Sequence, residues 1–151
     1  MMFAKTRKLI NRTALVLAAT AMLTACDDGT GPEDHREAVG MVITDQNNTT
    51  LVTVNASRQV TGSLTVARGA ARHLEVYFVD EDGDRFQLED GDDEFRLEVD
   101  VANPSIAAID SHGDHMDLEG LAAGTTTAEF KIMHGNHPDY ESGDIPITVT
   151  P

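Results

Sequence analysis

Three kinds of residue are scarce in this 151-residue chain: it has no tryptophan, a single cysteine, and 11 basic residues against 26 acidic ones. One cysteine excludes a disulfide within the chain. A formal net charge of −15 gives a surface that repels nucleic-acid phosphates and anionic lipid headgroups and attracts cations. The composition therefore predicts no nucleic-acid partner.

Signatures of catalysis are missing as well. The sequence has no nucleophile elbow and no glycine-rich phosphate loop, and Ser111 beside His112 stands in no recognisable nucleophile setting. A glycosidase would need aromatic rings to stack on a sugar, and here the tyrosines are only Tyr77 and Tyr140. We therefore expect that the protein is not an enzyme.

No apolar stretch is long enough to span a bilayer as a helix. The longest, "TALVLAATAMLTA", has about 13 residues where a spanning helix needs about 20. It follows residues 1–12, which carry four basic residues and no acidic one, and this layout is typical of a secretory signal peptide. The stretch ends at Leu23–Cys26, "LTAC", which resembles the lipobox of bacterial lipoproteins.

The lipobox resemblance implies cleavage before Cys26 and lipid attachment to its thiol. Two or three acyl chains hold a protein on a membrane stably, because each buried CH₂ contributes about 0.8 kcal/mol. The alternative is an ordinary core thiol behind a cleavable signal. We expect a lipid-anchored, extracytoplasmic protein of the bacterial cell envelope, with a signal peptide over 1–25, the lipidated cysteine and an acidic tether over 26–37, and one domain over 38–151.

After the tether, apolar residues recur with period two. In Phe95–Val101, "FRLEVDV", apolar and charged side chains alternate as in a strand with one buried face. The same spacing predicts strands over 74–78, 126–132 and 145–149. Shorter strands are predicted over 41–45, 51–55, 60–67, 85–88, 106–109 and 116–121. No stretch has a long helical stripe, so the pattern predicts an all-β, antiparallel β-sandwich.

Three segments, "VDEDGDRF", "VDVANPSIAAID" and "LEGLAAGTTTAEFKI", resemble the bacterial immunoglobulin-like domains of invasin- and intimin-type surface proteins. The matching residues are Asp80, Gly83, Asn103–Ser105, Ala107, Asp110 and Gly120–Thr125. The resemblance implies an immunoglobulin-like sandwich and a role as a non-enzymatic binding or scaffold module. It names no ligand, because such domains serve as spacers, adhesins and carbohydrate-binding accessories.

Two segments depart from that family pattern, and each contains a His-x-x-His pair. The predicted topology places both pairs at one end of the sandwich. Imidazole and carboxylate groups are good ligands for zinc or copper, so this end is a candidate transition-metal site. Its proposed ligands are His112, His115, His134, His137, Asp114 and Asp139.

Plainer interpretations of these segments stay open. The residues inside each pair are ordinary turn formers. A thioether from Met116 or Met133 would favour copper, but strand alternation places Met116 in the core and Met133 on the solvent side. "DEDGDR" resembles a calcium loop, yet its glycine is fourth and not sixth, which favours a hairpin turn at Asp82–Gly83. Two hypotheses remain: a membrane-anchored binding or scaffold module, and transition-metal binding or handover.

Overall fold

The computed structural model describes residues 36–89, 91 and 94–151. Within these ranges the chain is all-β, as predicted, with twelve strands and no helix. Consequently, this part of the chain has no helix with the length and apolarity to cross a membrane. The predicted signal peptide, Cys26 and most of the predicted tether lie outside the described residues.

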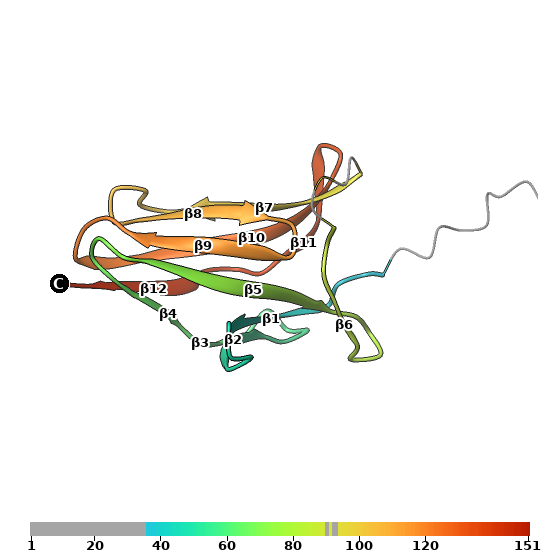
Figure 1. Cartoon of the computed structure of the whole chain (residues 1–151). Coiled ribbons are helices and arrows are strands. Elements are labelled where there is room, and N and C mark those ends of the chain that lie inside the picture. Colours follow the sequence, from blue (N-terminus) through green and yellow to red (C-terminus); the bar gives the residue numbers. More distant parts are fainter. Residues whose placement is uncertain (1–35, 90, 92–93) are drawn as a thin grey trace, which may run out of the picture. The chain divides into compact units, whose positions relative to one another are not determined.

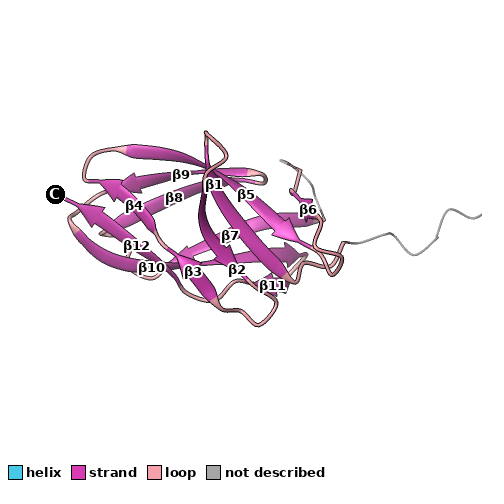
Figure 2. Cartoon of the chain, turned by 90° about the horizontal axis from the view of Figure 1, so that it is seen from below, coloured by secondary structure: helices cyan, strands magenta, loops and turns pink. Residues whose placement is uncertain are grey.

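The strands form two sheets, which are visible as two layers in Figures 1 and 2. Sheet A has the order β3 (Val60–Gly62), β2 (Thr50–Val54), β1 (Gly40–Asp45), β5 (Ala71–Val79), β9 (His115–Gly120) and β8 (Ala107–His112), and β6 (Arg85–Phe86) pairs with β5. Sheet B has the order β11 (His137–Glu141), β10 (Gly124–His134), β12 (Ile145–Thr150) and β4 (Leu64–Ala67), and β7 (Phe95–Val101) pairs with β10.

One hydrophobic core lies between the sheets, and alternate residues of each strand enter it. From β5 the side chains of Leu74, Val76 and Phe78 are fully buried, and from β10 those of Phe130 and Ile132 join the same cluster. This is the inward half of the predicted period-two pattern.

The two methionines that flank the histidine pairs are both buried. Met116 is fully buried in the core, as predicted. Met133 was predicted to face solvent, and this was wrong, because its exposed fraction is 8%. It does not belong to the core cluster, however; it lies on β10 between its register neighbours Arg96 of β7 and Pro138 of β11. Met133 is therefore buried on the outer face of sheet B by its neighbours on β7 and β11, and not by the core.

The predicted strand over 60–67 is divided in two. β3 ends at Gly62 in sheet A and β4 begins at Leu64 in sheet B, so the chain crosses between the sheets at Ser63. Gly62 has φ +95°, and a Cβ at this position would overlap the carbonyl oxygen of Leu51. Only glycine fits such a close approach at this backbone angle.

This crossing also produces a parallel pair, which the antiparallel prediction did not include. β4 lies beside β12 in parallel, with Leu64 opposite Ile147 and Val66 opposite Val149. Every other pair of strands in the described residues is antiparallel.

The crossing gives a stability prediction. We expect Gly69→Ala to cost about 1 kcal/mol of unfolding free energy, because its φ is +79° but a Cβ would meet nothing within 4 Å. Gly69→Ala is the control. Gly62→Ala has the same kind of backbone strain and also places a Cβ against the Leu51 carbonyl oxygen, so it should lower the unfolding free energy by about 1 kcal/mol or more beyond the control. Urea unfolding of both variants measures this, and equal losses would contradict it.

Candidate functional site

Both His-x-x-His pairs form two-residue β-hairpin turns. His112 ends β8 opposite His115 at the start of β9, and His134 ends β10 opposite His137 at the start of β11. The first turn residue of each is a glycine with positive φ, +69° at Gly113 and +57° at Gly135. Glycine at this place is the requirement of a type II′ hairpin. The turn residues therefore set each histidine directly across from its pair mate.

The two hairpins lie toward the same end of the domain, away from the C-terminus (Figure 1). The Ser111 hydroxyl, next to His112, lies 3.5 Å from the Leu97 carbonyl oxygen of β7. Leu97 in turn pairs with Ile132 of β10, two residues before His134. The first hairpin nevertheless belongs to sheet A and the second to sheet B, so the predicted ligands divide into two clusters.

The sheet B hairpin brings ligand atoms together. Among the described residues, His134, His137 and Asp139 are the one group of three whose ligand atoms all lie within 4.8 Å of one another. The Asp139 carboxylate contacts both rings, at 3.0 Å from Nδ1 of His137 and 3.4 Å from Nδ1 of His134. Nitrogen and carboxylate ligands of this kind suit zinc and copper(II). Half of the predicted six-residue set therefore converges.

A β-bulge places Asp139 in this position. Ile132 of β10 pairs with Tyr140, whereas Met133 pairs with Pro138, so Asp139 is an extra residue in β11 with no partner in the ladder. Bulges of this kind redirect a side chain next to functional sites. The sequence did not predict β11, because proline is rare within strands except at edges and bulges.

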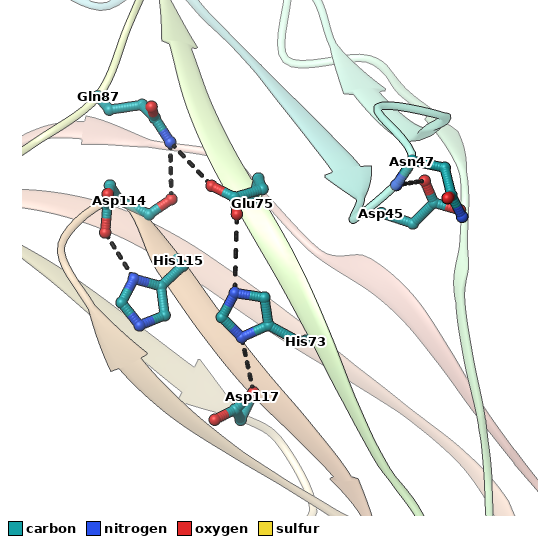
Figure 3. A network of polar contacts seen from close by, with 8 residues as sticks. All are labelled: Asp45, Asn47, His73, Glu75, Gln87, Asp114, His115 and Asp117. Atoms are coloured by element: carbon teal, nitrogen blue, oxygen red, sulfur yellow. Dashed lines mark hydrogen bonds and ion pairs between the residues drawn. The ribbon is translucent and has the colours of Figure 1, made fainter.

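The sheet A hairpin forms a different cluster, drawn in part in Figure 3. Nδ1 of His115 lies 2.6 Å from the Asp114 carboxylate, and Nε2 of His112 lies 3.4 Å from that of Asp110. The His112 and His115 rings stack with their centroids 5.1 Å apart. Neither histidine joins the group of His134, His137 and Asp139. The structure therefore does not assemble the single four-histidine site expected from the sequence.

His73 of β5 is a third member of the sheet A cluster that the sequence did not reveal. Its ring centroid is 4.9 Å from that of His115, and its nitrogens lie 3.0 Å from Asp117 and 3.6 Å from Glu75 (Figure 3). The pairing of β5 with β9 brings these residues together from more than 40 positions apart. The only local signal was the outward position of His73 in the alternation of its strand.

The turn at Asp114 is hydrogen-bonded to β5 and to Gln87. The Asp114 carbonyl oxygen accepts the backbone N–H of Val76 at 2.9 Å and the Gln87 side-chain amide at 2.9 Å (the latter is drawn in Figure 3). The hydrogen bond that His115 donates to the Asp114 carboxylate raises the pKa of His115. Desolvation opposes this shift, and the nearby charges of Asp114, Glu75 and Asp117 raise the pKa further. Protonated His115 is thus favoured in the folded state.

This pKa direction predicts a pH-dependent effect of Asp114→Asn. Because the folded-state pKa of His115 is raised, the stabilisation is fully present below the unfolded value of about 6.5 and is lost as pH rises through the folded value. We expect the variant to lose about 0.2–1 kcal/mol at pH 5.5, the range of solvent-exposed ion pairs, and almost nothing at pH 8.5.

Urea unfolding in EDTA at the two pH values measures that difference. Glu119→Gln removes an equal charge from an exposed position of β9 and serves as the control. An equal loss at both pH values would show that Asp114 acts without His115 protonation.

The acidic segment "DEDGDR" forms a hairpin turn that its own aspartate stabilises. The Asp80 carboxylate accepts backbone N–H groups from Asp82 at 3.1 Å and Asp84 at 2.8 Å, and Gly83, with φ +86°, donates to the Asp80 carbonyl. This is the hairpin turn that the glycine spacing favoured.

The sequence matches no protein-family model and no curated protein. Among solved structures, domains 4 and 5 of the S-layer protein SbsC superpose with a TM-score of 0.45 and 19% identity, over 60% of this chain and 49% of that one. Domains 5–6 of SbsC give 0.43 and 18%, over 60% and 40%, and a longer SbsC structure gives 0.44 and 18%, over 60% and 12%.

This chain therefore spans half or less of the length of each of these structures. At these TM-scores and identities the likeness assigns no function to it.

Proposed function

We propose that this chain is a lipid-anchored, extracytoplasmic and non-enzymatic binding or scaffold module of the immunoglobulin type. The observation that carries the fold part is the strand order. Seven strands can be given the immunoglobulin letters A to G in chain order: β1, β5, β7, β8, β9, β10 and β12. Sheet A then contains A-B-E-D and sheet B contains C-F-G, which is the constant-type immunoglobulin order. β2, β3, β4, β6 and β11 are additions to this frame.

The serines near acidic or histidine residues support the non-enzymatic part of the proposal. The Ser142 hydroxyl is buried, donates to the Gly143 carbonyl at 2.7 Å and accepts the Phe130 N–H at 2.9 Å. Ser111 faces the carbonyl oxygen of Leu97. Both hydroxyls therefore bind backbone, and neither is hydrogen-bonded to a base that would activate it.

The anchor part of the proposal is carried by the lipobox-like end of the signal at Cys26. It predicts that Cys26→Ser abolishes lipidation and moves the protein from the membrane fraction to the soluble fraction. Immunoblotting of fractionated cells measures this. The domain should remain folded, because its first strand begins only at Gly40. Persistent membrane association of the variant would mean that a different anchor holds the protein.

A second candidate function is the binding of a divalent transition metal at the sheet B hairpin. The convergence of His134, His137 and Asp139 is the observation that favours it. Both flanking methionines are buried, so neither offers a thioether at the surface. The donors are therefore nitrogen and oxygen, which suit zinc or copper(II) better than copper(I).

We expect zinc to raise the melting temperature of the described domain. A single ion at about 100 times its Kd stabilises the fold by about 2.7 kcal/mol. His137→Ala should abolish this gain, whereas His112→Ala, the matched change in the other hairpin, should retain it. Differential scanning calorimetry with zinc and with EDTA measures the shift. An unchanged melting temperature of the wild-type protein would contradict the metal function.

A further inference from the structure

The ring of His134 is packed against a neighbouring strand. His134 ends β10, where it pairs with Phe95 of β7 on one side and with His137 of β11 on the other. Its ring stacks on that of Phe95, with the centroids 4.6 Å apart and an angle of 29° between the planes. Stacking fixes the plane of an imidazole, but a half-turn about its Cβ–Cγ bond keeps that plane and exchanges the edges of the ring. A further contact is therefore needed to decide which nitrogen faces which side.

The two nitrogens of this ring face different carboxylates. Nδ1 lies 3.4 Å from the Asp139 carboxylate, which also lies 3.0 Å from Nδ1 of His137. Nε2 lies 3.2 Å from the Glu94 carboxylate, in a contact with hydrogen-bond geometry. The converging ligand atoms are those of His134, His137 and Asp139. An ion held by this group therefore binds Nδ1 of His134, and Glu94 lies on the opposite side of the ring, where it cannot bind the same ion.

The hydrogen bond at Nε2 selects the form of the ring that can bind such an ion. A neutral imidazole has one N–H and one lone pair. When Glu94 accepts the N–H of Nε2, the lone pair is on Nδ1, the nitrogen that faces Asp139. In metal sites the nitrogen that binds the ion is set in this way by the hydrogen bond of the other nitrogen, and the carboxylate that accepts this bond also makes the ligand more basic.

The backbone of Glu94 is hydrogen-bonded to the hairpin that carries the ligands. The Gly135 N–H donates to the Glu94 carbonyl at 3.3 Å, and the Arg96 guanidinium donates to the Gly135 carbonyl at 2.7 Å. These two bonds hold the turn of the hairpin against the start of β7. The position of Glu94 beside His134 is therefore set by backbone and side-chain contacts that need no ion.

We propose that Glu94 is a positioning residue of the metal site: it accepts the Nε2 hydrogen of His134 and so presents the Nδ1 lone pair to an ion held with His137 and Asp139. This inference rests on the metal-binding function proposed above. It adds to that function a residue that does not touch the ion and that lies outside the hairpin, in the segment before β7.

The tautomer of His134 gives a test that needs no metal. In the full-length protein with nitrogen-15 in its histidines, proton–nitrogen correlation spectra show which ring nitrogen carries the hydrogen, and His134→Ala identifies the signals. The spectra are recorded in EDTA at pH 8.5, above the ordinary imidazole pKa of about 6.5. We expect the Nε2–H form in the wild type. In Glu94→Ala the Nδ1–H form should increase, because Asp139 is then the competing acceptor.

Zinc affinity measures the effect on the site. Calorimetric titration with zinc chloride should show an affinity about 10-fold lower or more in Glu94→Ala. Glu94→Gln should recover part of this loss, because its side-chain carbonyl oxygen can still accept the Nε2 hydrogen. Glu119→Ala, which removes the same charge from an exposed position of β9, should bind as tightly as the wild type. At saturating Co²⁺ the visible spectrum of Glu94→Ala should equal that of the wild type, because the ligands are unchanged.

The outcomes separate this inference from the function on which it rests. An unchanged tautomer in Glu94→Ala overturns the inference even if the zinc affinity falls, because the carboxylate then acts through its charge alone. Full affinity in Glu94→Ala, with no binding by His137→Ala, leaves the metal function standing and overturns the role of Glu94. If the wild type takes up no zinc, both fail. Equal melting temperatures of the variants in EDTA assign a loss of affinity to the site and not to misfolding.

Discussion

The backbone pairing of β10 is the interaction on which the rest of this domain depends. Along one edge this strand bonds to β7 over seven residue pairs, and along the other it bonds first to β12 and then to β11. Its inward residues Phe130 and Ile132 contribute to the sheet B side of the core, together with residues of β4, β7, β11 and β12. Its last residue, His134, carries the candidate metal site. The hydrogen-bond ladder of β10 therefore positions both core residues and the candidate metal ligand His134.

Strands with one buried face were predictable, because alternation of apolar and polar residues directly reports which face packs. "FRLEVDV" and "TTAEFKI" were located in this way, and both are strands of sheet B. The crossing at Gly62 was not predictable from the same signal, since the alternation continues through it. Its cause is a steric approach to Leu51, which only the three-dimensional arrangement creates. β11 was missed because "HPDYE" has no period-two apolar pattern, unlike "IPITVT" of β12, and because Pro138 is untypical of a strand.

The candidate site shows the same division between local and long-range causes. The His-x-x-His spacing with an internal glycine encodes a hairpin that pairs its own histidines, and both pairs are formed. Whether the pairs meet depends on the distance between sheets, which is about 10 Å and which no local motif encodes. His73 lies beside His115 through the pairing of β5 with β9, and Glu94, which precedes β7, lies 3.2 Å from His134 through the pairing of β7 with β10. Long-range register thus adds carboxylates from other strands to the local ones, Asp110, Asp114 and Asp139, that each hairpin supplies itself.

The parallel pairing of β4 with β12 has a consequence for how the chain folds. Leu64 and Ile147 are about 80 positions apart, and bringing such distant segments together slows folding. β4 has no partner in sheet B until β12 has been made, so one edge of this sheet stays open while residues 68–144 are synthesised. The pairing that completes this edge of sheet B therefore waits until Ile145–Thr150 has been made, and until then the unpaired strand can associate with other chains.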